Sequence, residues 1–124
     1  LCGVYDNDKS TKQIQSKWPQ FIVEGMGCKC VEEEPWVTVA ETSELVIALT
    51  KIGLTNEAEA LFNCLHQWRD KDDGLYWTGY VYTDEKFWPI EKPTWTAAAV
   101  LLAADALYEF TPGSKLFLRS WTNK

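Results

Sequence analysis

The stretch at residues 94–110 reads TWTAAAVLLAADALYEF, and no polar side chain interrupts residues 97–104. A helix that is apolar on every side is buried all round in a globular protein. Thr94 or Thr96 is suited to cap this helix at its start, and Thr-Pro-Gly at 111–113 is suited to end it. A chain of 124 residues has too few other helices to surround one helix completely. The stretch therefore predicts an inner helix, and a chain that is one piece of a larger helical assembly.

More helices are expected on either side of this stretch. Residues 10–24 place apolar side chains at helical spacing, and Pro19 predicts a kink or a break at Trp18. Residues 25–35 contain glycines, three consecutive glutamates and a proline, which is typical of a loop. Residues 114–121 are expected to add a short terminal helix.

Two helices in the middle of the chain are expected to form a tight helical hairpin. The first begins at Thr38, and Glu41 follows at the spacing of a capping box. Gly53 is suited to end it, and Thr55 is suited to cap the next helix. The second helix carries a clear apolar stripe, which consists of Ala58, Leu61, Phe62, Leu65 and Trp68.

Residues 70–93 form a long segment that is rich in aromatic and turn residues. Residues 72–74 are a turn signal, residues 75–82 are long enough to pair briefly as a ribbon, and Pro89 and Pro93 break any helix. Loops longer than about 12–15 residues are usually functional or disordered. The aromatic content argues against disorder, so we predict an ordered loop that carries function.

The composition excludes several classes of function. Twelve basic and eighteen acidic residues give a net charge of −6. Because no basic block is present, we expect no nucleic-acid partner. No apolar run approaches the roughly 20 residues of a membrane span, so we expect none, and the pattern of cysteines favours a cytoplasmic protein. Cys2, Cys28, Cys30, Cys64 and His66 match no common zinc pattern, so we expect reduced thiols, no metal site and no cofactor.

Three blocks of sequence resemble the C-terminal part of bacterial prenyltransferase-like proteins of unassigned activity. The blocks are residues 35–42 (PWVTVAET), residues 73–79 (DGLYWTG), and residues 94–99 with 103–107, and the resemblance extends over residues 15–118. Residues 67–77 (QWRDKDDGLYW) also resemble, with a different spacing, the Q-x-x-x-G-x-W repeat of terpenoid cyclases.

This resemblance implies a fold and a domain organisation. Terpenoid cyclases, protein prenyltransferases and six-hairpin glycosidases share the α/α toroid. The expected fold is therefore all-α, with antiparallel helical hairpins that form part of an α/α toroid. Residues 1–124 are then a single helical domain, a fragment of a longer toroid chain.

The long loop favours a carbohydrate-like ligand. Aromatic rings stack on sugar faces, and carboxylates bind hydroxyl groups or act as acid and base, as the paired carboxyls of a glycosidase do. We predict Glu41, Asp73 and Glu91 as catalytic residues. The predicted ligand-binding residues are Trp36, Tyr76, Trp77, Tyr80, Trp88 and Trp95.

Two other functions stay open at this stage. A prenyltransferase-like or terpenoid-cyclase-like protein would act on an isoprenoid, although the basic residues that could hold a diphosphate, Lys71, Lys86 and Lys92, are scattered. Alternatively, the aromatic side chains only close the end of the toroid, and the chain is a non-catalytic interaction module. The expected partners are a small-molecule or glycan ligand, and either a second copy or the remainder of the chain against the inner helix.

Overall fold

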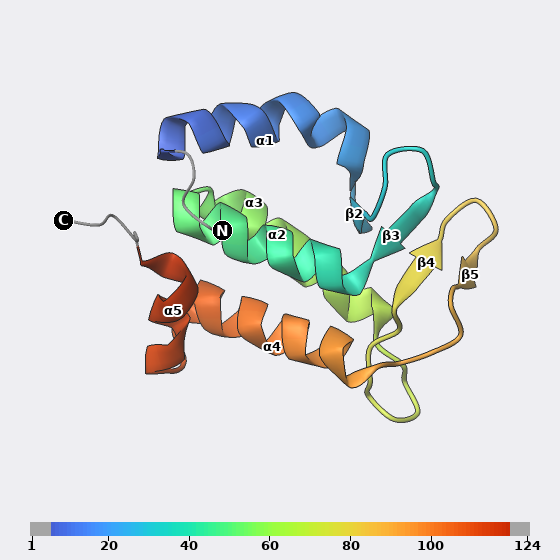
Figure 1. The fold of residues 1–124 in the computed structure, drawn as a ribbon. Coiled ribbons are helices and arrows are strands. Elements are labelled where there is room, and N and C mark those ends of the chain that lie inside the picture. Colours follow the sequence, from blue (N-terminus) through green and yellow to red (C-terminus); the bar gives the residue numbers. More distant parts are fainter. Residues whose placement is uncertain (1–5, 120–124) are drawn as a thin grey trace.

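The computed structural model describes residues 6–119, in which an antiparallel sheet adjoins one end of a group of packed helices (Figure 1). The helices are α1 (Asn7–Phe21), α2 (Val39–Ile52), α3 (Thr55–Leu65), α4 (Thr94–Tyr108) and α5 (Lys115–Leu118). The strands are β1 (Ile22–Val23), β2 (Gly27–Lys29), β3 (Trp36–Thr38), β4 (Gly79–Val81) and β5 (Lys86–Phe87). Short 3₁₀ helices lie at His66–Trp68 and Pro112–Ser114.

The sheet has the order β1-β2-β3-β4-β5, and each neighbouring pair is antiparallel. In the central pair, Trp36 lies opposite Val81 and Val37 lies opposite Tyr80. Directly opposed residues share one face of a sheet. Val37 is 1% exposed, so the face that it shares with Tyr80 is turned to the core. Trp36 and Val81 are therefore presented on the opposite face.

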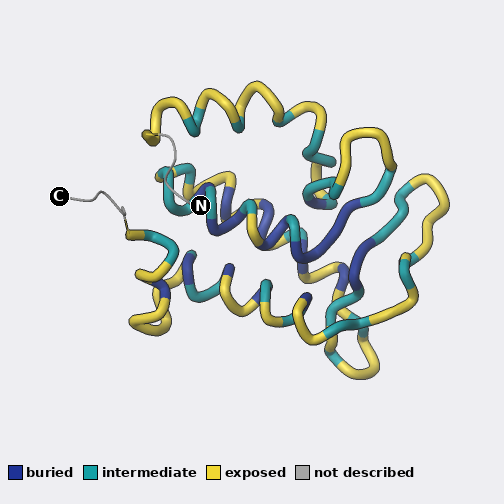
Figure 2. Tube along the Cα trace, in the orientation of Figure 1, coloured by how far each residue is buried: buried dark blue, intermediate teal, exposed yellow. Residues whose placement is uncertain are grey.

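The core is centred on α2, which packs against both α3 and α4. Val39, Val46 and Leu49 on α2 are fully buried. The aromatic side chains of the sheet extend this core, because Trp68 stacks on Tyr80 with ring centroids 4.5 Å apart. α1 lies on the side of α2 that is remote from α4, and none of its residues is buried (Figures 1 and 2).

The all-α prediction is wrong, and with it the α/α toroid and the six-hairpin arrangement. The structure is α+β, because a five-stranded antiparallel sheet lies within residues 6–119. Each strand is only two or three residues long, which is too short for the alternating pattern that identifies a strand in a sequence. The pairing of β3 with β4 is also non-local, since the whole α2–α3 segment separates these two strands.

Several local predictions are confirmed within this different fold. Gly53 ends α2 in the left-handed conformation with a φ of 84°, and α3 turns back against α2. The long aromatic segment is ordered and contains the β4–β5 hairpin. The predicted terminal helix is shorter in the described chain, where α5 ends at Leu118; Trp121 lies outside the described residues.

The predicted helix boundaries and caps need correction. α1 continues through Pro19 to Phe21, so the predicted break at Trp18 is wrong, although the proline removes one hydrogen bond of the helix. Thr38 precedes α2 as predicted, but its side chain makes no capping hydrogen bond. The predicted threonine caps of α3 and α4 are wrong, because Thr55 and Thr94 are the first residues of these helices. The cap positions are taken by Leu54 and Pro93, and neither makes a side-chain cap bond.

α4 is not buried on every side. Val100, Ala103 and Ala106 face the core, whereas Leu101 is 71% exposed and Leu102 is 45% exposed. α4 is covered where it packs against α2 and α3 and, at its C-terminal end, by the short helices at Pro112–Ser114 and Lys115–Leu118. Within residues 6–119 no further layer of helices lies on its other side (Figure 1).

A cluster of charges holds the turn before β4. The ammonium group of Lys92 lies 2.8 Å from a carboxylate oxygen of Asp70 and also pairs with Asp73. Asp73 in addition accepts a hydrogen bond of 2.9 Å from the backbone N–H of Leu75. The hydrogen bond and charge of Lys92 lower the pKa of Asp73, and the Leu75 N–H acts in the same direction.

Within residues 6–119, the helices are too short or too polar for any of them to cross a lipid bilayer.

We predict that Leu49→Ala lowers the free energy of unfolding by about 2–5 kcal/mol, because it leaves a cavity in the centre of the core. Leu116→Ala removes the same atoms from an exposed side chain and should change it by less than about 0.5 kcal/mol. Chemical denaturation of both variants measures the difference. Equal effects would contradict the placement of the core.

We also predict that the carboxyl group of Asp73 titrates below its ordinary pKa of about 3.9. Since this pKa is lower in the folded chain, the ion pair stabilises the turn above pH ~4 and is lost as the pH falls through the lowered value. Lys92→Gln should return the pKa of Asp73 towards its ordinary value. NMR titration of the side-chain carboxyl measures both, and an unchanged titration in the variant would refute the ion pair.

Candidate functional site

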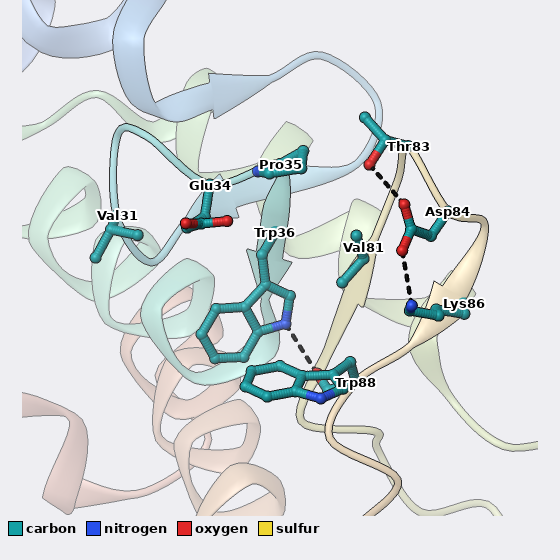
Figure 3. A pocket seen from close by; sticks show the side chains of 9 residues that line it. All are labelled: Val31, Glu34, Pro35, Trp36, Val81, Thr83, Asp84, Lys86 and Trp88. Carbon is teal, nitrogen blue, oxygen red and sulfur yellow. Dashed lines mark hydrogen bonds and ion pairs between the residues drawn. The ribbon is translucent and has the colours of Figure 1, made fainter.

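A groove with a volume of about 580 Å³ lies on the outer face of the β3–β4–β5 region (Figure 3). Two segments that are distant in the sequence line it. Val31, Glu34, Pro35 and Trp36 come from the β2–β3 connection and the start of β3. Val81, Thr83, Asp84, Lys86 and Trp88 come from the β4–β5 hairpin and the residue after it.

Trp36 and Trp88 form the aromatic part of this groove. Their rings meet edge to face, with centroids 5.1 Å apart and an interplanar angle of 74°. The indole Nε1–H of Trp36 donates a hydrogen bond of 2.8 Å to the backbone carbonyl of Trp88. This bond holds the Trp36 ring in place, while the Trp88 side chain remains 51% exposed and available for stacking.

Gly79 makes room for this arrangement. A Cβ atom at position 79 would lie 2.6 Å from the carbonyl oxygen of Val37 and would also collide with the indole of Trp36. The carbonyl of Gly79 accepts a hydrogen bond of 3.0 Å from the backbone N–H of Trp88. The missing side chain therefore lets Trp36 lie across β4, and the backbone at the same residue anchors Trp88.

Charged side chains stand on two sides of the tryptophan pair. In Figure 3, Glu34 lies on one side of Trp36, and Asp84 and Lys86 lie on the other. A carboxylate oxygen of Asp84 is 2.7 Å from the ammonium nitrogen of Lys86, and Asp84 accepts a hydrogen bond of 3.1 Å from Thr83. The hydrogen bond from Lys86 is the main cause of a lowered pKa at Asp84, which favours the ionised carboxylate. The groove thus combines aromatic faces with carboxylates and one ammonium group.

The other predicted ligand-binding residues lie elsewhere. Trp77 stacks on Phe87 at 4.9 Å, with the Lys92 ammonium 4.6 Å from its ring centroid. Tyr80 stacks on Trp68 against the core, and the hydroxyl of Tyr76 is 3.1 Å from Nδ1 of His66. Trp95 is 53% exposed in the first turn of α4. Of the six predicted side chains, the structure brings Trp36 and Trp88 together in the groove.

None of the three predicted catalytic carboxylates lines this groove. Glu41, in the first turn of α2, accepts a hydrogen bond of 3.6 Å from the thiol of Cys30. Asp73 is paired with Lys92 as described above. Glu91 is exposed, and its carboxylate accepts a hydrogen bond of 3.3 Å from the hydroxyl of Thr78. Their catalytic role stays a prediction.

Among the described residues, Cys28, Cys30 and Cys64 are free thiols, and Cys2 lies outside that part of the chain. Burial raises the pKa of the Cys28 thiol to about 11, and the charge of Glu41 contributes. The proton is thus held on this thiol near neutral pH. In the part of the chain between residues 6 and 119, no three His, Cys, Asp or Glu side chains gather closely enough to hold a metal ion.

The sequence prediction did not select Glu34, Asp84 and Lys86 as site residues. A signal was present, because residues 32–36 (EEEPW) and residues 84–89 (DEKFWP) each combine acidic side chains, a tryptophan and a proline. Only the pairing of β3 with β4 and of β4 with β5 brings the two segments to one groove.

Comparisons with known proteins give one informative match. No protein-family model matches the chain. The chain is 49% identical over 117 residues to a protein of Mycolicibacterium hassiacum named MMP endo-(1,4)-3-O-methyl-alpha-D-mannosidase. The alignment covers 94% of this chain and 32% of the mannosidase, so the chain spans about a third of that relative's length.

This match corrects the resemblance to prenyltransferase-like proteins and terpenoid cyclases. The relative is a mannosidase, and it aligns with all three blocks that carried the resemblance, because it covers nearly the whole chain. The blocks around Trp36, Trp77 and α4 are therefore not evidence for isoprenoid chemistry. Nearly the whole chain is similar to one part of a mannosidase.

Proposed function

We propose that the chain binds a glycan in the groove of Trp36 and Trp88, and that the glycan is an O-methylated, α-linked mannose chain. The observation that carries this proposal is the half-exposed ring of Trp88, which is set against Trp36 and flanked by charged side chains. The 49% sequence identity to the mannosidase supports the choice of sugar, since the name of that relative specifies 1,4-linked 3-O-methyl-α-mannose.

The chemistry of the groove suits such a ligand. The C–H faces of a pyranose ring are apolar and stack on exposed indoles. Glu34 and Asp84 can accept hydrogen bonds from free hydroxyl groups, and Lys86 can donate to ring or ether oxygens. The aliphatic side chains of Val31, Pro35 and Val81 provide an apolar wall for a methyl ether, which has no proton to donate.

We predict that Trp88→Ala weakens binding of a 1,4-linked 3-O-methyl-α-mannose oligosaccharide by about 10-fold to 100-fold, the effect of losing one large buried aromatic contact. Isothermal titration calorimetry measures the dissociation constant. Trp88→Phe keeps an aromatic face and should retain most of the affinity.

Phe110→Ala is the matched control for this experiment, because it removes an exposed aromatic ring that does not line the groove. Circular dichroism establishes that each variant is folded. Equal affinity of the wild-type chain and the Trp88→Ala variant would rule out the groove as the binding site.

We further predict a preference for the methylated sugar. Each methyl group that the apolar wall covers adds about 0.8 kcal/mol of transfer free energy, or roughly a fourfold gain in affinity. Titrations with methylated and unmethylated 1,4-linked mannose oligosaccharides of equal length test this. Tighter binding of the unmethylated sugar would contradict the proposed role of Val31, Pro35 and Val81 while leaving glycan binding itself intact.

Hydrolysis is the second candidate function, and the presence of two carboxylates in the groove favours it together with the relative's name. The lowered pKa of Asp84 suits a carboxylate that stays ionised, and Glu34 is the second carboxylate of the groove. If the chain cleaves the methylated oligosaccharide, Glu34→Gln and Asp84→Asn should each slow cleavage by about 10²-fold or more while binding is retained.

Chromatography of the oligosaccharide products measures this cleavage. Full cleavage by the Glu34→Gln and Asp84→Asn variants would mean that these two carboxylates do not catalyse the reaction. The predicted carboxylates Glu41, Asp73 and Glu91 would then be the next positions to substitute.

A further inference from the structure

The outward face of α4 is apolar along its length. Trp95, Ala98, Leu101 and Leu102 are exposed at the spacing of one helix face, whereas Val100, Ala103 and Ala106 of the same helix are buried. Figure 2 shows that the exposed side of α4 is turned away from α2. Leu101 has 71% of its surface exposed. Residues three and four apart on a helix are neighbours, so these side chains form one continuous ridge.

The same surface continues to Tyr108, the last residue of α4, and to Phe110 just after the helix; the Tyr108 ring also packs edge to face on Phe62 of α3. The rings of Tyr108 and Phe110 lie 5.7 Å apart, and Phe110 is 73% exposed. Soluble monomers rarely expose large continuous apolar patches, and those that do occur mark interaction sites. We call the surface of Trp95, Ala98, Leu101, Leu102, Tyr108 and Phe110 the α4 face.

The α4 face has almost no charge to offer a partner. Asp105 is the only charged residue of α4, and both of its carboxylate oxygens are already engaged by Thr111, with hydrogen bonds of 2.7 Å from the backbone N–H and 2.8 Å from the hydroxyl. A nucleic acid or a charged peptide would find no ion pair on α4. The complementary partner is an apolar helix, because a ridge of side chains at helical spacing packs into the groove of another helix.

The length of the relative indicates where such a helix comes from. The match spans 117 of the 124 residues, so the segment that corresponds to α4 lies inside the aligned part of the mannosidase. The aligned part makes up 32% of the mannosidase, so most of that polypeptide lies outside the match.

We infer that the α4 face docks an apolar helical segment equivalent to the part of the mannosidase that lies outside the match. This inference is independent of the proposed glycan binding, because the α4 face shares no residue with the groove of Trp36 and Trp88.

The test compares the same substitution in two settings. The first is the 124-residue chain by itself, and the second is a chimera in which this chain replaces its equivalent in the full-length mannosidase. Leu101→Lys together with Leu102→Lys should leave the melting temperature of the single chain within about 2 °C, because both side chains already face water. In the chimera the same pair should lower the melting temperature by at least about 5 °C, because lysines would be buried against the docked helix.

Gln15→Lys is the control, since Gln15 is exposed on α1, on the other side of α2 (Figure 1). It should leave the melting temperature unchanged in both settings. If the chimera does not fold, the same substitutions are placed at the aligned positions of the mannosidase itself, with the same expected loss.

Two results would overturn the inference. One is an equally small effect of the lysine pair in both settings. The other is a dimer of the single chain that Leu101→Lys and Leu102→Lys dissociate in analytical ultracentrifugation, because a second copy would then be the occupant of the α4 face. Loss of glycan binding by Trp88→Ala has no bearing on either result, so the two proposals fail separately.

Discussion

The pairing of β3 with β4 is the constraint on which the rest of the structure depends. It joins residues 36–38 to residues 79–81 and so closes the chain around the α2–α3 pair. The alternation of side chains along β3 then places Val37 in the core and Trp36 on the opposite face. A register shift by one residue would exchange these two side chains, burying the indole and exposing the valine. The core and the groove are therefore set by the same hydrogen bonds.

The tryptophan pair is built from backbone as much as from side chains. Trp36 is held by the carbonyl of Trp88, and the N–H of Trp88 is held by the carbonyl of Gly79. These bonds orient two large aromatic rings, of which Trp36 is half-buried and Trp88 remains 51% exposed. The charged side chains at the rim are exposed, so the ion pair of Asp84 with Lys86 contributes little to folding and stays accessible to hydroxyl groups.

The two proposed surfaces have different physical origins. The groove combines stacking faces with hydrogen-bonding groups, which is the chemistry of a polar ligand with apolar C–H faces. The α4 face offers aliphatic and aromatic side chains with no available charge, which is the chemistry of a buried interface. Its position on the far side of α4 from α2 means that a partner could cover it without rearranging the core.

The sequence by itself determined the helices and much of the local chemistry. Periodic apolar residues located the helices, and Gly53 marked a helix end because glycine adopts a positive φ at little cost. The tryptophans led to the prediction of a carbohydrate-like ligand, and their role in binding stays a prediction. Only the tertiary structure decided the fold class and which tryptophans meet. The strands are only two or three residues long, and the central pair of β3 with β4 joins segments far apart along the chain, so no local pattern of side chains encodes that pairing. For the same reason Glu34, Asp84 and Lys86 became neighbours of Trp36 and Trp88 only once the register of the sheet was known.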